Sequence, residues 1–281
     1  MAEIFKEAVF PSKCIACGSF FRFSGKIDSL YTEDSALRSF EPEDITFEKV
    51  MAPFVCADCL GGFLPAESPV CCVCGFVFKS REGEDHLCGK CIEFPKRFGK
   101  ARAVGLYYRT FMEVIHSFKY KGKLQLAGPL ETLLFSVLMR HWNINDFDLV
   151  VPVPLHVKRF RERGFNQAFV LVRNWAVMAE KFVAGPGNLR IGRDVLERTR
   201  YTEPQTGLGR EKRMKNIKGA FTVRDASTIE GKRVLLVDDV YTSFAQPNFS
   251  GNHQHLIGLS VFAAGLHANL LCNQSCRAFL Y

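Results

Sequence analysis

From residue 101 to residue 243, apolar and polar positions alternate in blocks that predict strands followed by helices. Three apolar stretches fit buried strands, at residues 101–108, 148–154 and 234–237. Short apolar runs with polar borders are typical of strands covered on both faces, as in parallel sheets. Apolar residues recur at helical spacing over 111–120, over a leucine-rich stretch at 126–142, and over 165–183. The pattern therefore predicts an α/β fold built on a parallel sheet.

Polar groups with ligand-binding chemistry follow the predicted strands. The third strand runs into Asp238 and Asp239 and then into the hydroxyl residues Thr242 and Ser243. Because open α/β sheets bind ligands beyond the carboxyl ends of their strands, these groups indicate a sugar-phosphate site.

Basic residues follow the second strand. We interpret residues 155–167 as a loop that carries Lys158, Arg159, Arg161 and Arg163, with Gly164 allowing a turn into the next helix. Arginine binds phosphate or pyrophosphate in a bidentate manner. An ordinary solvated basic face is the alternative for any one of these side chains.

A long polar segment lies between two strand-like ends at 194–197 and 217–223. A loop of this length inside a compact domain is usually functional or disordered. Arg198, Gln205, Arg210 and Arg213 are its candidate contacts to an anion, as part of a lid that closes over the ligand.

Charge is distributed unevenly along the chain of 281 residues. Residues 151–225 carry a net charge of +9, whereas residues 1–99 carry −4. The basic excess predicts an anionic ligand for the α/β portion. The longest apolar stretch, 256–271, is too short and too interrupted to span a membrane, and Glu3, Lys6 and Glu7 do not suit a signal peptide. We therefore expect a cytoplasmic protein without a membrane span.

Eight of the eleven cysteines form four CxxC motifs, all in residues 1–95. Two such motifs supply the four thiolates of a structural zinc site, so the spacing predicts two sites. Consecutive pairing is the simplest arrangement, and an interleaved pairing remains open. Disulfides do not suit a cytoplasmic protein. The predicted ligands are Cys14, Cys17, Cys56, Cys59, Cys71, Cys74, Cys88 and Cys91, and we interpret Cys72 as a small buried residue rather than a ligand.

Three stretches resemble the ComF family of double-zinc-ribbon, phosphoribosyltransferase-like proteins associated with competence and DNA uptake. They are KYKG at 119–122, PVPLHVKRFRERGFNQ at 152–167, and RTRYTEPQTGLGREKRMKNIKGAF at 198–221, which leads into VLLVDDVYTS. Together with the four CxxC motifs, the resemblance extends from about Cys14 to Ser243.

The resemblance implies a type I phosphoribosyltransferase fold that binds phosphoribosyl pyrophosphate with Mg²⁺, and hence a role in nucleotide metabolism. Asp238 and Asp239 would hold the ribose hydroxyls as the catalytic pair. Lys158, Arg159 and Arg163 would bind the pyrophosphate, and Arg198 and Arg213 would belong to the lid. Thr242 and Ser243 would begin the 5′-phosphate loop.

The family pattern stops after Ser243. A Gly-Ala-Thr-like turn is expected there, and this chain reads Phe244-Ala245-Gln246-Pro247. Without the glycine, backbone amides lose their close approach to a phosphate, and proline removes a donor. Residues 244–281 also show no clear helix or final strand. The change indicates either a shift of reading frame near codon 243 or genuine divergence, and it predicts weak or absent binding of phosphoribosyl pyrophosphate.

The sequence thus predicts a zinc-ribbon domain at 1–95, a phosphoribosyltransferase-like domain at 96–243, and a tail at 244–281 that is foreign to the fold. The first functional hypothesis is a phosphoribosyltransferase or a descendant of one. The alternative is a non-enzymatic module whose zinc ribbons and basic loops dock single-stranded DNA or a DNA-uptake or recombination protein.

Overall fold

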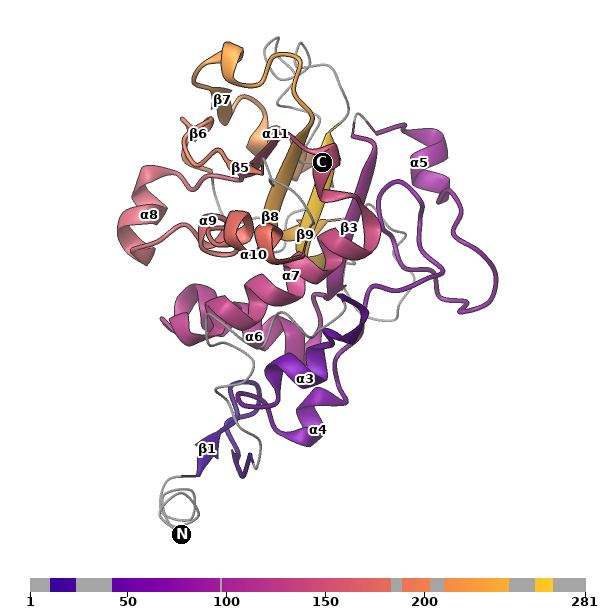
Figure 1. The fold of residues 1–281 in the computed structure, drawn as a ribbon, viewed down its shortest axis with the longest axis vertical. Coiled ribbons are helices and arrows are strands. Elements are labelled where there is room, and N and C mark those ends of the chain that lie inside the picture. Colours follow the sequence, from indigo (N-terminus) through magenta and orange to yellow (C-terminus); the bar gives the residue numbers. More distant parts are fainter. Residues whose placement is uncertain are drawn as a thin grey trace.

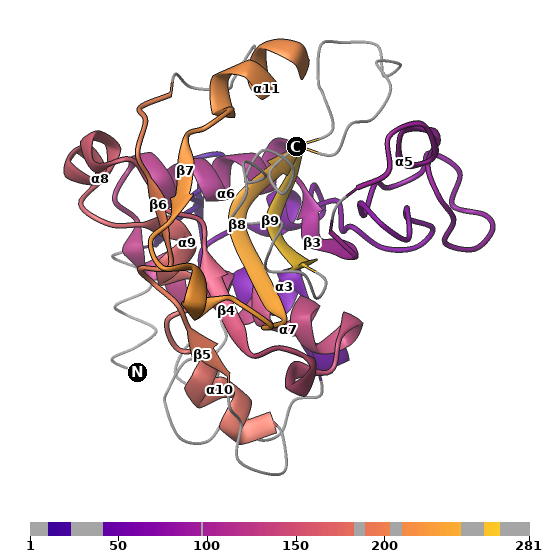
Figure 2. The ribbon, with the colours of Figure 1, turned by 90° about the horizontal axis from the view of Figure 1, so that it is seen from above.

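A five-stranded sheet forms the centre of the computed structural model, which describes residues 11–23, 42–96, 98–182, 189–202, 210–242 and 256–264. The strand order is β3-β9-β8-β4-β5. The strands are β3 (Lys100–Leu106), β4 (Leu149–Pro152), β5 (Arg190–Ile191), β8 (Val234–Thr242) and β9 (Leu256–Ala264). Figure 1 shows this sheet with helices below it, and Figure 2 shows the same strands from above.

The prediction of an α/β fold with a parallel sheet is confirmed for the strands that form its core. β4 pairs in parallel with both β5 and β8. The sheet is nevertheless mixed, because β9 lies antiparallel between β8 and β3. The expectation of no strand after residue 243 is therefore wrong for Leu256–Ala264. This segment carries no charged residue, and a strand flanked by neighbours on both sides reads as a continuous apolar run without periodicity.

β8 extends further than the sequence predicted. We expected the strand to end at Asp238, but it continues through both aspartates to Thr242. β4 ends at Pro152, opposite Val237, and beyond that point β8 pairs with β9. The antiparallel partner supplies backbone hydrogen bonds that keep the segment after Val237 extended.

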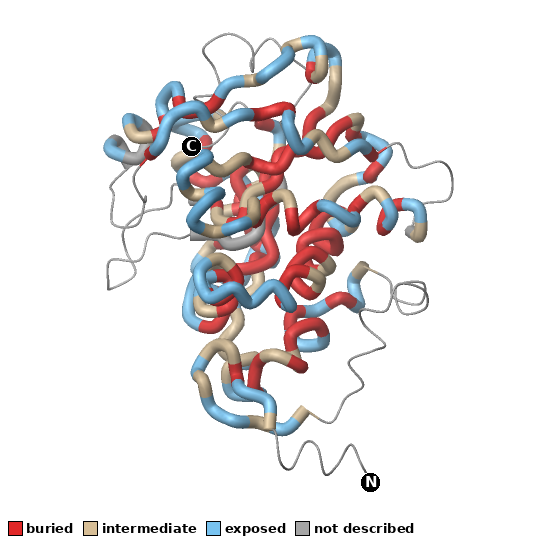
Figure 3. The backbone as a smooth tube through the Cα atoms, turned by 90° about the vertical axis from the view of Figure 1, so that its left-hand side faces the viewer, coloured by how far each residue is buried: buried red, intermediate tan, exposed pale blue. Residues whose placement is uncertain are grey.

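Two helices that the sequence predicted cover one face of the sheet. They are α6 (Arg109–Tyr120) and α7 (Ala127–His141), which follows the short 3₁₀ turn η3 (Leu124–Leu126). The leucine stripe of α7 is fully buried and shares one core with Leu235 and Val237 of β8. Figure 3 shows that buried residues are concentrated along the middle of the molecule. Burial of so many large apolar side chains explains why the pattern predicted both helices correctly.

The predicted helix at 165–183 is instead two shorter ones, α9 (Gln167–Val170) and α10 (Trp175–Phe182). Asn174, between them, donates from its backbone N and its Nδ2 to the buried carboxylate of Glu131, at 2.8 and 2.9 Å. A buried carboxylate needs such partners, and supplying them fixes the chain at the point where the helix breaks.

The predicted basic loop after β4 is also a helix, α8 (Val157–Arg163), ended by Gly164 with φ +83°. Its N-terminal cap is His156, whose side chain accepts a hydrogen bond from the backbone N of Lys158. The left-handed glycine closes the helix, which is the usual role of glycine at this position. Because most residues of this helix are polar, apolar periodicity did not predict it.

The predicted strand-like ends around the lid pair with each other. They are β6 (Leu196–Arg198) and β7 (Phe221–Val223), and they form a separate antiparallel ribbon. Between them lies α11 (Arg210–Ile217). Ile217, which we predicted to begin the second strand-like end, is therefore the last residue of a helix.

The Cys-rich N-terminal portion packs directly on the α/β portion. Its elements are β1 (Ser12–Lys13), β2 (Phe20–Phe21), α3 (Phe47–Met51), α4 (Ala57–Leu60) and α5 (Gly89–Glu93). It pairs with the open edge of β3, where the N of Ala101 donates to the O of Val73 at 2.7 Å and the N of Leu106 to the O of Leu64 at 2.8 Å. Covering an edge strand in this way blocks pairing with other chains.

Buried residues from both sides of position 95 share the two main cores. The division into three domains stays a prediction. None of the helices in the described ranges has the length and apolar character needed to cross a membrane.

Candidate functional site

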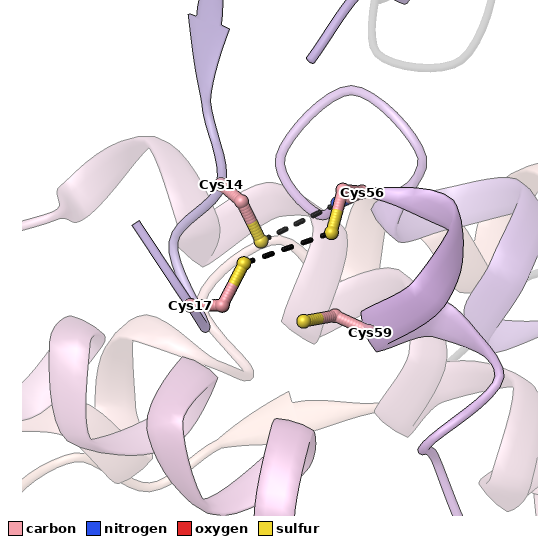
Figure 4. Close-up of side chains that lie close together, drawn as sticks. All are labelled: Cys14, Cys17, Cys56 and Cys59. Carbon is pink, nitrogen blue, oxygen red and sulfur yellow. Dashed lines mark hydrogen bonds between the residues drawn. The ribbon is translucent and has the colours of Figure 1, made fainter. Parts of the chain in front are cut away.

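Four cysteines from the first two CxxC motifs converge on one point, as Figure 4 shows. The Sγ atoms of Cys14, Cys17, Cys56 and Cys59 all lie within 4.8 Å of one another. Cys14 and Cys17 belong to the turn between β1 and β2, while Cys56 caps α4 and Cys59 lies in its first turn. The Sγ atoms of Cys17 and Cys56 are 3.7 Å apart.

The last two motifs form a second cluster of the same kind. The Sγ atoms of Cys71, Cys74, Cys88 and Cys91 lie within 4.8 Å of one another, and all four residues are buried. The predicted consecutive pairing of motifs is therefore confirmed, and the interleaved pairing is wrong. Cys72 is partly exposed and belongs to neither cluster.

The two clusters repeat the same local design. In each, the first cysteine of the second motif donates its backbone N–H to the Sγ of the first cysteine: Cys56 to Cys14, and Cys88 to Cys71, both at 3.4 Å. A left-handed glycine, Gly18 or Gly75, follows the first motif. A side chain would also not fit at Gly75, because a Cβ there would lie 2.7 Å from the O of Ala101.

The donor sets fit zinc. A tetrahedral ion with Zn–S bonds of about 2.3 Å sets the sulfur atoms about 3.8 Å apart, which agrees with the 3.7 Å between Cys74 and Cys88. Within the second cluster, burial raises the pKa of the Cys91 thiol to about 12, while hydrogen bonding from Cys74 lowers the pKa of Cys71. A divalent cation resolves this conflict by stabilising all four thiolates, so each cluster could hold a structural zinc ion.

A buried ion pair lies where α6 meets β8. Lys119 Nζ is 2.9 Å from Asp239 Oδ2, and the side chains are only 10% and 7% exposed. The ring centre of Tyr107, just after β3, lies 6.0 Å from Lys119 Nζ. Lys119 was not among the predicted site residues, although the KYKG motif contains it and was the signal that could have identified it.

Asp238 has different surroundings from Asp239. It is partly buried, and its Oδ1 accepts a hydrogen bond from the backbone N of Asp239 at 2.8 Å. Burial raises the pKa of Asp238 to about 8, and the neighbouring Asp239 charge adds to the effect while Lys119 opposes it. Burial and the neighbouring negative charge both favour the protonated form of this carboxyl group.

The basic helix α8 directs its side chains toward the segment after β6. Arg159 Nη2 donates to the O of Thr202 at 3.2 Å, and Arg198 donates to the hydroxyl of the same residue. Lys158 Nζ and the Arg159 guanidinium lie 4.9 and 5.6 Å from the ring centre of Tyr201. The structure therefore brings three predicted ligand-binding cations together around Tyr201 and Thr202.

Arg163 lies apart from that group. It donates to the side chain of Gln167, and its guanidinium is 4.9 Å from the ring centre of Tyr120. The side chains of Arg213 and Thr242, and all of Ser243, lie outside the described residues. Their predicted roles stay predictions, as do those of the other ligand-binding residues.

Comparisons with known proteins agree with the motifs. Competence protein F of Haemophilus influenzae is 27% identical over 204 residues, which cover 68% of this chain and 86% of that protein. The chain is related to the ComF proteins. Competence protein ComFC of Bacillus subtilis is 24% identical, covering 70% of this chain and 75% of the relative. DNA utilization protein YhgH of Escherichia coli K12 is 28% identical, covering 56% and 67%.

The resemblance to the ComF family is thus confirmed. No protein-family model matches the chain. No solved structure matches it either.

Proposed function

We propose that this ComF relative acts in the uptake or use of DNA, and that its α/β portion binds phosphoribosyl pyrophosphate with Mg²⁺. The names of its relatives support the DNA context. The observation that carries the ligand is the acidic pair on β8, with Lys119 held against Asp239. On β8, the pair lies just past the position that is paired with the end of β4, and the basic helix α8 begins after that same end. Open α/β sheets bind ligands at this edge.

The chemistry of the site suits a ribose with a charged leaving group. The Asp238 carboxyl group orients the ribose hydroxyls, and Arg159 with Lys158 attracts the pyrophosphate. Mg²⁺ contributes a further positive charge, held largely by the ligand's own oxygens and by water. The sequence Phe244-Ala245-Gln246-Pro247 lacks the glycine of the family turn, so we expect weak binding.

Calorimetry tests this proposal. Phosphoribosyl pyrophosphate titrated into the full chain with Mg²⁺ is expected to give weak, saturable binding that Asp238→Asn abolishes. Ribose 5-phosphate serves as the control that lacks the pyrophosphate and is expected to bind more weakly still. No binding at millimolar ligand, or equal binding by Asp238→Asn, would refute the proposal.

A second function, binding of single-stranded nucleic acid, is favoured by a separate observation. Tyr201 and Tyr120 are 38% and 58% exposed, and each lies against a cation of α8. Exposed aromatic rings among cations are the platform on which bases of single strands stack. Asp238→Asn should spare this activity, whereas Tyr201→Ala should reduce it, so the two functions are separable.

A further inference from the structure

Thr202 connects two elements that carry predicted ligand-binding cations. It lies in the segment after β6 and is only 2% exposed. Its hydroxyl accepts a hydrogen bond from Arg198 of β6, and its backbone O accepts one from Arg159 Nη2 of α8 at 3.2 Å. The two guanidinium groups therefore converge on this one buried residue.

The ribbon of β6 and β7 fixes Arg198 relative to α8. Arg198 pairs with Phe221 across the ribbon, and its guanidinium lies 5.1 Å from the centre of that ring. Phe221 is buried in a small core together with Val153, which directly follows β4. Figures 1 and 2 show the ribbon beside α8, which follows the same strand. Both arginines are thus tied to the end of β4.

The charge gathered around Thr202 is positive. Among the described residues, no carboxylate forms an ion pair with Arg159 or with Lys158. Arg159 Nε is buried and makes no hydrogen bond within that part of the chain. A buried donor without an acceptor costs free energy, and cations without a counter-ion attract anions. The arrangement therefore suits an anionic ligand.

We propose that Arg159 and Arg198 form a binding site for one phosphate group, and that Thr202 is the positioning residue that holds the two guanidinium groups near each other. This inference rests on the proposed function, because the phosphate group belongs either to phosphoribosyl pyrophosphate or to the backbone of single-stranded DNA. Guanidinium groups bind phosphate oxygens in a bidentate manner, and fixing them beforehand lowers the entropy cost of binding. Thr202 fixes them through neutral oxygen atoms, so their charge remains available to the ligand.

The chain offers a matched control for Thr202. Thr202→Val removes the hydroxyl that accepts from Arg198 but keeps the size of the side chain, and Thr202→Ser keeps the hydroxyl. Thr222, on β7 of the same ribbon, has an exposed side chain. Thr222→Val therefore makes the same chemical change away from the two arginines.

The first measurement is calorimetry with inorganic pyrophosphate as the probe. We expect Thr202→Val to weaken binding by about tenfold, the effect of losing one hydrogen bond to a charged group. Thr202→Ser should retain most of the affinity, and Thr222→Val should match the unsubstituted chain. Should Thr202→Val fail to fold, Arg198→Gln removes the same hydrogen bond from its other end. No binding by the unsubstituted chain, or a lower urea midpoint in Thr202→Val with unchanged affinity, would overturn the proposal.

A double-variant cycle tests whether the two arginines meet the same phosphate group. Arg159→Gln, Arg198→Gln and the double variant are titrated with the same probe. We expect each single change to weaken binding and the double variant to lose less than the sum of the two. Additive losses would show that the arginines act at separate places and would overturn the shared site.

Two further titrations identify the source of the phosphate group. Phosphoribosyl pyrophosphate with Mg²⁺ and a labelled single-stranded oligonucleotide are each titrated into the unsubstituted chain and into Thr202→Val. Weakening of one ligand alone assigns the site to that ligand, and weakening of both shows that they share it. If both bind and neither is weakened, the proposal fails while the proposed function stands. If the unsubstituted chain binds inorganic pyrophosphate but neither of these ligands, the proposed function is refuted and the phosphate site remains.

Discussion

The Sγ atoms of Cys74 and Cys88 lie 3.7 Å apart in the core that also contains Tyr241 of β8. Tyr241 is 3% exposed, and both its burial and the nearby cysteines raise its pKa. The second cysteine cluster therefore packs against the strand segment that carries the acidic pair. A metal ion held by this cluster would therefore support the strand that carries the candidate ligand site as well as the local turn.

We expect the purified chain to contain two zinc ions and Cys74→Ser to contain one. Binding energy at a structural zinc site is folding energy, so this variant should also melt at a clearly lower temperature. Metal analysis together with thermal unfolding measures both effects. Cys72→Ser is the control, because Cys72 belongs to neither cluster, and it should retain both ions. Two ions in Cys74→Ser would contradict the assignment.

Arg102→Met should destabilise the fold by about 1–3 kcal/mol, the cost of leaving buried hydrogen-bond acceptors without a donor. Arg102 is 5% exposed. Its Nη1 donates to the carbonyl oxygens of Cys71, Cys72 and Ala101, and its Nη2 lies 3.5 Å from Asp85. The residue thus ties β3 to the second cluster.

Urea unfolding with Arg224→Met as the control checks the role of Arg102. Arg224 pairs with Glu197 at 3.3 Å, but both side chains are about half exposed, and such pairs contribute at most about 1 kcal/mol. Equal losses in the two variants would show that Arg102 has no special role.

Acid should destabilise the chain through His141. Burial, with nearby Arg102 and Lys100, lowers the pKa of His141 to about 4 from the usual value of 6.5. Between these two values the unfolded state binds a proton that the folded state does not, so stability falls as the pH drops from 6.5 to 4. His141→Gln should flatten this dependence in urea titrations at several pH values. His116→Gln, on the exposed side of α6, should leave it intact, and a slope unchanged in His141→Gln would contradict the prediction.

Tyr201→Ala should weaken binding of single-stranded DNA by about 1–3 kcal/mol, the range for loss of one stacked base. Arg159→Gln should instead reduce the steepness with which affinity falls as salt rises, because it removes one contact to phosphate. Fluorescence anisotropy with a labelled oligonucleotide at several salt concentrations measures both. Phe20→Ala, which removes a 70% exposed ring beside the first cluster, should change neither value. Equal loss in Phe20→Ala and Tyr201→Ala would exclude the α8 surface.

Local patterns in the sequence were sufficient for the elements that bury continuous apolar faces. The strands β3 and β4 and the helices α6 and α7 were predicted because their burial imposes a period on the residue types. The eight cysteine ligands were predicted because a tetrahedral ion requires paired thiolates at short spacing. Sequence reasoning missed α8, whose residues are mostly solvent-facing, and the break before α10, which depends on Glu131 of another helix.

The sequence by itself determined the eight cysteines that form the two clusters, the parallel arrangement of the sheet core and the relation to the ComF proteins. Only the tertiary structure decided which cysteine motifs pair, how far β8 continues, and which aspartate Lys119 neutralises. Lys119 and Asp239 are 120 positions apart in the chain, yet their charged atoms lie 2.9 Å apart. A contact of that kind depends on how α6 packs against the sheet, and no local pattern of residues records it.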